Sequence, residues 1–177
     1  DPNLDPVLNI PATILKVTPN VDKVILEMGI EYKGEMDFYL SLIRPKTVIV
    51  TKIAYAHSKF LGDISDIALE KGKLLEQLPQ DGVAILNWDD LETRKLSQNV
   101  KGDVLYFGCD PKTCTVWAGN IRVENFKTTF ELNLGVERVK VNYKLLGRHQ
   151  VYPALAAAAL GVLYDMPLTK IKLGLEE

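Results

Sequence analysis

Short apolar runs rich in valine and isoleucine alternate with amphipathic stretches in the first half of the chain. The runs occupy residues 23–28, 47–53, 82–87 and 103–107. Runs of this length, separated by segments with helical periodicity, are typical of parallel strands whose two faces are both covered by helices. The pattern therefore predicts an α/β fold with a mostly parallel sheet flanked by helices.

An amphipathic helix is predicted between the second and third runs. Asp63 or Ser65 can cap its start, and Pro79 lies beyond its end. Lys71 falls in the middle of the stripe that should be buried. The apolar positions of this stripe recur every three or four residues and are Ile64, Ile67, Ala68, Leu74, Leu75 and Leu78.

Residues 115–143 change to alternating strand patterns. Strands are predicted at residues 115–117, 121–123, 128–134 and 137–143, with Gly119 and Gly135 at turns. Helical patterns return at residues 151–164, where Pro153 is tolerated in the first turn, and at residues 168–175. We expect one domain over residues 1–177, in which residues 115–143 form a small antiparallel insert.

Composition excludes several kinds of partner. The chain carries 21 basic and 23 acidic side chains, a formal charge of −2, so it lacks the one-sided field typical of nucleic-acid or anionic-membrane binding. Its longest apolar run, residues 154–164, is about half of the roughly 20 residues that a membrane-spanning helix requires, and no signal segment opens the chain. Cys109 and Cys114 lack the further ligands of a structural zinc site. We expect a cytoplasmic protein whose partners are small molecules or proteins.

Polar residues that follow the apolar runs are the first candidates for a site, because ligands bind at the carboxyl ends of parallel strands. Glu27 closes the first run and either holds magnesium through a carboxylate oxygen or simply marks the end of the strand. His57 follows the second run, where a histidine serves as a ligand or as a structural or solvated loop residue. Neither residue decides the function by itself.

Lys71 is a candidate because of its place on the apolar stripe. A lysine there is costly unless its charge is paired, its stem reaches water, or its pKa is depressed so that the amine reacts. One explanation is a stem that extends to solvent. The other is a functional amine, including one converted to a carbamate, which replaces a cation with a metal-binding or charge-relay anion.

A polar cluster that includes Asn87, Asp89 and Asp90 ends the third run. Asparagine and aspartate are favoured at helix caps and turns, so a structural role competes with ligand binding. Both roles are compatible with the position of the cluster at the carboxyl end of a strand.

At these same positions the chain resembles the central domain of the Mur ligases, and most closely the branch that adds D-alanyl-D-alanine to a UDP-muramoyl tripeptide. The matching elements keep one order and include the 14-residue interval from His57 to Lys71. They are ValIleLeuGluMetGly at 24–29, GlyGluMet at 34–36, ArgPro at 44–45, AlaHis at 56–57, PheLeuGly at 60–62, LysGly at 71–72, LeuAsnTrpAspAsp at 86–90, LeuGlyArgHis at 146–149 and AlaLeuAlaAlaAlaAla at 154–159.

The resemblance implies a P-loop NTPase-like domain of an ATP-dependent ligase of peptidoglycan precursor synthesis. Such an enzyme activates a carboxylate as an acyl phosphate, from which an amine displaces phosphate. Glu27 and His57 would bind Mg²⁺, and Lys71, carbamylated, would place a second Mg²⁺ and the acyl phosphate. The implied cofactors are ATP and Mg²⁺, and the implied substrates are the UDP-muramoyl peptide and D-alanyl-D-alanine. The residues expected to bind the nucleotide are Asn87, Asp89, Asp90, Arg148 and Gln150.

Two parts of the family pattern are expected outside the chain. The Gly-rich phosphate loop ending in GlyLysThr should lie upstream of Asp1, and the C-terminal domain should follow Glu177. The isolated chain is therefore expected to be inactive. The strand that precedes the loop would be missing with it, so the sheet is expected to have an exposed position that another chain can occupy.

Other departures fall inside the matched region. Gln150 and Pro153 stand where the family usually has asparagines, one of which often faces adenine. Thr51 and Lys52 lie where an asparagine precedes the AlaHis pair. The alternatives are a Mur-like ligase of another pathway, including the folylpolyglutamate or cyanophycin type, and a non-catalytic binding or scaffold domain that keeps the fold.

Overall fold

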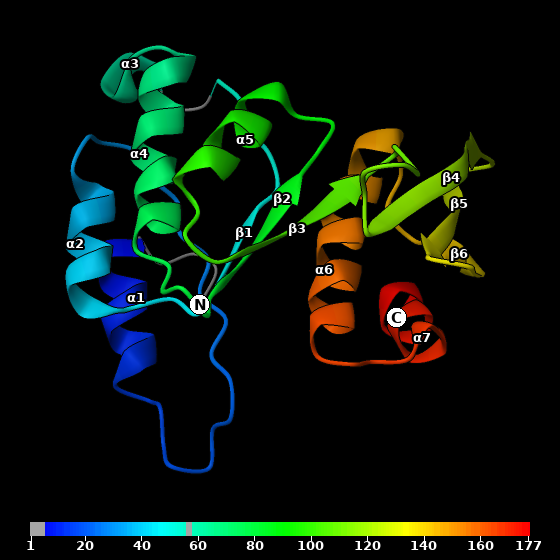
Figure 1. Cartoon of the computed structure of the whole chain (residues 1–177), viewed down its shortest axis with the longest axis horizontal. Helices are drawn as coiled ribbons and strands as arrows, with labels where there is room; N and C mark the ends of the chain where they lie inside the picture. The colour runs from blue at the N-terminus through cyan, green and yellow to red at the C-terminus, as the bar shows by residue number, and fades with distance from the viewer. Residues whose placement is uncertain (1–5, 56–57) are drawn as a thin grey trace.

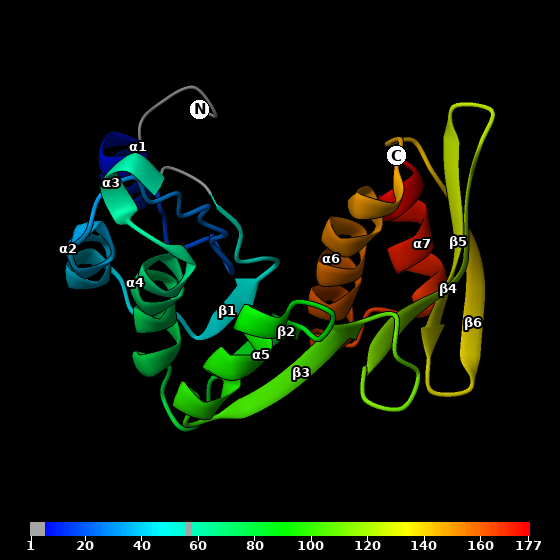
Figure 2. The ribbon, with the colours of Figure 1, turned by 90° about the horizontal axis from the view of Figure 1, so that it is seen from above.

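A mixed sheet of six strands, in the order β1-β2-β3-β4-β5-β6, forms the centre of the protein. The computed structural model describes residues 6–55 and 58–177. Figures 1 and 2 show α1 to α5 gathered on one side and α6 and α7 on the other. The strands are β1 (Thr47–Val50), β2 (Val83–Asn87), β3 (Asp103–Gly108), β4 (Val116–Glu124), β5 (Lys127–Leu134) and β6 (Glu137–Tyr143). The helices are α1 (Pro6–Ile14), α2 (Glu35–Leu42), α3 (Ser58–Leu61), α4 (Ile64–Glu76), α5 (Leu91–Leu96), α6 (Val151–Leu163) and α7 (Leu168–Glu176), with 3₁₀ turns at Ser97–Asn99 and Arg148–Gln150.

The parallel part of the sheet is buried on both faces. Ala84 and Leu86 of β2 contribute to a core formed with α1, α2 and α4, whereas Ile85 contributes to a second core formed with α6 and α7. Successive side chains of a strand face opposite sides, so a strand covered on both faces is apolar at every position. The pairs β1–β2, β2–β3 and β3–β4 are parallel, which confirms the predicted α/β fold with a mostly parallel sheet.

The prediction of a strand at residues 23–28 is wrong. Residues 23–28 form neither a helix nor a strand, and Val24 and Ile25 are exposed. Among the described strands, β1 pairs with β2 alone, and none pairs with residues 23–28. An apolar β-forming sequence becomes a strand only when a ladder satisfies its backbone groups.

The strands of the antiparallel insert continue the same sheet. β4 joins β3 through two parallel pairs, Phe107 with Val116 and Gly108 with Trp117, and β4, β5 and β6 are antiparallel to one another. The predicted turn at Gly119 is wrong, because β4 runs through it with a shift in register. The turn at Gly135 is confirmed, and its φ of +57° is one that glycine adopts at little cost. Figure 2 shows α6 and α7 lying between the parallel strands and the antiparallel ones.

Helix α4 confirms the predicted amphipathic helix. Asp63 forms a capping box with Asp66, in which each side chain accepts the other residue's N–H, and so fixes the start of α4. The predicted C-terminal helices are also present, with Pro153 in the first turn of α6. Across residues 6–55 and 58–177, no helix combines the length and apolar content needed to cross a membrane.

Candidate functional site

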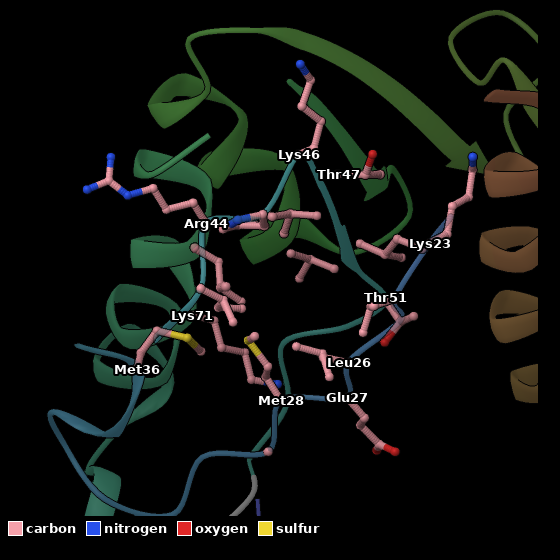
Figure 3. A pocket seen from close by; sticks show the side chains of 18 of the residues that line it. Lys23, Leu26, Glu27, Met28, Met36, Arg44, Lys46, Thr47, Thr51 and Lys71 are labelled. Carbon is pink, nitrogen blue, oxygen red and sulfur yellow. The ribbon is translucent and has the colours of Figure 1, made fainter. Parts of the chain in front are cut away.

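A cleft of about 880 Å³ lies between β1 and the coil at residues 22–29. One wall is formed by residues 43–52, which include β1, and the other by residues 22–24 and 26–29. Helix α4 contributes Lys71 and Leu74, as Figure 3 shows for the lysine. Two of the predicted site residues, Glu27 and Lys71, therefore line one cavity although they are far apart in the sequence.

Lys71 reaches the cleft because of the way α4 packs. Ile67 and Leu75, four residues to either side, are fully buried, so the apolar stripe brings Lys71 against the sheet as its spacing predicts. The lysine is half-buried and forms no ion pair with any described residue. Burial lowers the pKa of Lys71, and the Asp90 carboxylate acts in the opposite direction. A larger share of this amine is neutral, and hence nucleophilic, than for an exposed lysine.

Glu27 is exposed at the opposite wall of the cleft. In Figure 3 its carboxylate extends away from the Lys71 amine, so the two side chains share the cavity without bonding to each other. His57, the third residue of the predicted metal set, lies outside the described residues. Within the part of the chain that the structure describes, no three histidine, cysteine, aspartate or glutamate side chains are grouped around a point that suits a metal.

Asn87 and Asp90 fix the backbone at the carboxyl ends of β1 and β2. The Asn87 amide donates to the Thr51 carbonyl at 2.7 Å. One Asp90 oxygen accepts the Ile53 N–H and the other accepts the Thr93 N–H at the start of α5, both at 3.0 Å. Asp90 is therefore a helix cap, the structural role expected of aspartate, and it also holds the segment that follows β1.

Asp89 lies in a second group of polar side chains, beyond the carboxyl end of β3. Its carboxylate accepts the Cys109 N–H at 2.8 Å, and the Asp89 and Tyr152 side chains both influence the Cys109 thiol. Burial, followed by the Asp89 charge, raises the pKa of this thiol to about 11, so it stays protonated at neutral pH. The Arg148 charge acts in the opposite direction, which places Arg148 close to the same thiol.

Sequence reasoning missed Cys109 and Tyr152 as members of this group. Cys109 immediately follows β3, so the rule that ligands bind at carboxyl ends of strands could have found it. Gln150 lies just before α6, at its N-cap position, and its side chain makes no capping bond. Neither Arg148 nor Gln150 lines the cleft, and the same is true of Asn87, Asp89 and Asp90.

A further residue that sequence reasoning missed is the buried Glu70. One of its oxygens accepts the N–H groups of Gly34 at 2.8 Å and Met36 at 3.2 Å, at the start of α2. The other oxygen pairs with the Lys73 ammonium at 2.8 Å. Glu70 thereby fixes α2, whose Met36 lines the cleft, against α4. A glutamate three residues after Ile67, on the edge of the apolar stripe, was the available signal.

Comparison with known proteins relates the chain to one family of ligases. It matches the Mur ligase middle domain over residues 2–161. The UDP-N-acetylmuramoyl-tripeptide--D-alanyl-D-alanine ligase of Escherichia coli (strain K12) is 35% identical over 175 residues, which are 98% of this chain and 38% of that ligase. The ligase of the same name from Haemophilus influenzae is 27% identical over an alignment of 179 positions, which covers 99% of this chain and 38% of that ligase.

Solved structures share the fold. A crystal structure of MurF from Acinetobacter baumannii has a TM-score of 0.87 at 24% identity, over 96% of this chain and 37% of that one. The chain thus spans a little over a third of the length of the proteins it matches. Because the family match covers most of the 177 residues, the chain belongs to the Mur ligase family and corresponds to its middle domain.

Proposed function

We propose that this chain is the nucleotide- and magnesium-handling domain of an ATP-dependent ligase that adds D-alanyl-D-alanine to a UDP-muramoyl tripeptide. The tripeptide carboxylate would be activated as an acyl phosphate, and the amine of D-alanyl-D-alanine would displace phosphate to form the amide. Similarity over nearly the whole chain to ligases of that name supports this proposal.

The position of Lys71 carries the chemical part of the proposal. The amine is half-buried, faces the cleft and lies near Asp90, just beyond the carboxyl end of β2. A neutral amine adds to carbon dioxide: the N–C bond forms, the nitrogen loses a proton, and a carbamate anion results. The lowered pKa favours this step because it increases the neutral share of the amine. The cleft would thereby gain two oxygen donors in place of a cation.

The side chains that would bind magnesium offer oxygen donors, although no three potential ligands are grouped around one point among the described residues. Glu27 offers exposed carboxylate oxygens, and the carbamate on Lys71 would offer more, which suits the preference of magnesium for oxygen. His57 would complete the set. When bound, magnesium supplies a Lewis acid that neutralises charge on phosphate oxygens.

The nucleotide would lie at the same edge of the sheet, near Asp89, Arg148 and Gln150. The Arg148 side chain is exposed and has no ion pair with a described residue, so its guanidinium is available to phosphate oxygens. Asn87 and Asp90 would contribute by fixing the backbone at residues 51–53, to which their side chains are bonded.

Activity of the full-length protein tests the role of Lys71. With ATP, the UDP-muramoyl tripeptide and D-alanyl-D-alanine, Lys71→Ala should abolish phosphate release, and short carboxylates such as acetate should restore part of it. Lys46→Ala is the matched control, because Lys46 also lines the cleft but forms an exposed ion pair with Asp81. A Lys71→Ala enzyme that retains the wild-type rate would exclude the proposed role.

Magnesium dependence tests the metal ligands separately. In the same assay, His57→Ala and Glu27→Ala should each raise the magnesium concentration that gives half of the maximal rate. An unchanged requirement in both variants would show that the metal lies elsewhere.

A further inference from the structure

The sheet has an open edge at β6, at the end of the sheet farthest from β1. Among the described strands, β6 pairs with β5 alone. The β5–β6 turn has two residues, so the pair that flanks it, Leu134 and Glu137, exchanges ladder hydrogen bonds. Hydrogen-bonded and non-hydrogen-bonded pairs alternate along an antiparallel ladder. Arg138, Lys140 and Asn142 therefore turn their N–H and C=O groups away from β5, to the open edge.

A carboxylate already binds one of these edge groups. The Asn142 N–H donates to a Glu176 oxygen at 2.7 Å, and the Asn142 side-chain amide donates to the same oxygen at 3.2 Å. This contact agrees with the phase of the ladder, and it closes the edge at Asn142 with the end of α7. Among the residues that the structure describes, none accepts the N–H of Arg138 or Lys140. The open part of the edge is therefore short and centred on residues 138–140.

The open part of the edge is positively charged. Arg138 and Lys140 are exposed, and neither forms an ion pair with a described residue. Glu131 lies opposite Lys140 in the ladder, but its carboxylate accepts the Asn120 amide at 2.8 Å. Like charges at facing positions of two strands repel, so pairing of β6 with the β6 of a second copy is disfavoured. The same charges attract a strand that carries carboxylates.

An apolar surface adjoins the edge on its other side. Val139 points to the face opposite its two basic neighbours and packs against the core that includes residues of α7. Helix α7 contacts β6, and Figure 2 shows this helix beside the antiparallel strands. Leu173 precedes Glu176 by three residues on α7 and is 60% exposed. Helix positions three apart are neighbours, so Leu173 lies on the side of α7 that reaches the edge.

We propose that the β6 edge binds an extended segment of another protein, in which one apolar residue separates two acidic residues. The segment would pair as one more strand, with its backbone bonded to Arg138 and Lys140. Its carboxylates would lie beside these two basic side chains. The apolar residue would turn to the Leu173 side, because successive residues of a strand face opposite sides. Strand addition of this kind takes its affinity from main-chain hydrogen bonds and its specificity from alternate side chains.

Charge complementarity favours this occupant. Glu176 is an example of it within the molecule, since its carboxylate accepts an edge N–H. Because Glu176 closes the edge at Asn142, about three to five residues, roughly 10–17 Å of chain, would pair. The edge at β6 lies at the opposite end of the sheet from the strand that borders the cleft, so the proposal goes beyond the proposed ligase activity and does not depend on it.

Fluorescence anisotropy with labelled peptides tests the proposal on the 177-residue chain. A blocked peptide of sequence Thr-Glu-Val-Glu-Thr should bind saturably. Thr-Lys-Val-Lys-Thr reverses the charge, and the first peptide methylated on its three central nitrogens keeps the carboxylates but cannot donate to β6. Both controls should bind at least about 10-fold more weakly. Absence of saturable binding by the first peptide, or equal binding by either control, would overturn the proposal.

A pair of charge reversals in the protein tests the location of the binding surface. Lys140→Glu should weaken binding of the acidic peptide by about 10-fold or more and leave the urea midpoint unchanged, because the side chain is exposed. Lys127→Glu is the matched control, because it makes the same charge change at an exposed position of β5, away from the open edge. An equal loss of affinity in both variants would show that binding follows overall charge and would overturn the proposal.

Amide hydrogen exchange, measured by NMR, identifies the groups that the peptide covers. With saturating peptide, the amides of Arg138 and Lys140 should exchange about 10-fold more slowly. The amides of Val139 and Val141, which turn to β5, are internal controls. Unchanged exchange of Arg138 and Lys140 would overturn the proposal. Protection of these two amides that rises with the concentration of the chain alone, together with dimers in sedimentation, would assign the edge to a second copy and overturn it too.

Discussion

Replacing Glu70 with alanine should destabilise the chain by about 3 kcal/mol. Glu70 is 4% exposed and accepts the N–H groups of Gly34 and Met36, at 2.8 and 3.2 Å, while pairing with Lys73 at 2.8 Å. Hydrogen bonds to a charged group contribute about 1.5–3 kcal/mol each, and breaking a buried pair costs about 3–5 kcal/mol. The lower part of that range applies because Lys73 keeps its second partner, Asp37, at 2.7 Å.

Urea unfolding of the 177-residue chain, followed by circular dichroism, measures this loss. Glu70→Gln keeps an oxygen that can accept the two N–H groups but removes the charge, so it should cost about 1–2 kcal/mol. Asp37→Asn is the matched control, because it removes the exposed partner of Lys73 and should cost less than about 1 kcal/mol.

The order of the stability losses of the three variants tests whether Glu70 fixes α2 against α4. A cost below about 1 kcal/mol for Glu70→Ala, or a cost equal to that of Asp37→Asn, would mean that water replaces the carboxylate at the start of α2. It would follow that Glu70 does not fix α2 against α4, and that Met36 takes its place in the cleft wall through apolar packing alone.

Three further changes probe other parts of the molecule. The Asn142 N–H lowers the pKa of Glu176 in the folded chain, so the unfolded chain binds the proton first on acidification. The contact therefore stabilises the fold above the ordinary pKa of 4.5, and this stabilisation is lost as pH falls through the folded value. An NMR titration of the Asn142 amide should therefore show a midpoint below 4.5, and a midpoint at or above it would contradict the contact. Gly102→Ala should cost more than about 3 kcal/mol in urea unfolding, since its Cβ would lie 2.1 Å from the Gly82 carbonyl oxygen, and a cost below about 1 kcal/mol would show that the strands move apart easily. Lys71→Met should leave the urea midpoint unchanged or raise it, because an apolar side chain of similar length replaces a half-buried ammonium that has no ion pair with a described residue. A loss of stability above about 1 kcal/mol would indicate a structural role for Lys71.

The parallel strands could be predicted because a strand that is buried on both faces is encoded by a continuous apolar run. Residues 82–87 are apolar at nearly every position, and β2 is covered by helices on both sides. Residues 23–28 have a similar apolar composition but form no strand, and Val24 and Ile25 are exposed, because an apolar sequence does not by itself supply a backbone partner. The prediction of a turn at Gly119 is wrong for a related reason. A glycine can lie at a turn or at an irregularity within a strand, and only the pairing of β4 with β5 decides between them.

The candidate site could be predicted where one element positions the residue. Lys71 was found from helical spacing alone, since the neighbours that make its burial costly lie on the same helix. Glu70, Cys109 and Tyr152 were not found, because their partners lie on other elements and become neighbours only through tertiary packing. Asp89 is among the predicted residues, but its bond to the Cys109 N–H joins residues 20 positions apart and could not be predicted from the sequence.

The two walls of the cleft differ in the interactions that hold them in place. The α4 wall is held by the capping box of Asp63 at the start of the helix and by the buried Ile67 and Leu75 on either side of Lys71. The wall that carries Glu27 has no ladder among the described residues. A magnesium ion bound at Glu27 would therefore have to order a wall that no described ladder holds, and this ordering costs binding free energy.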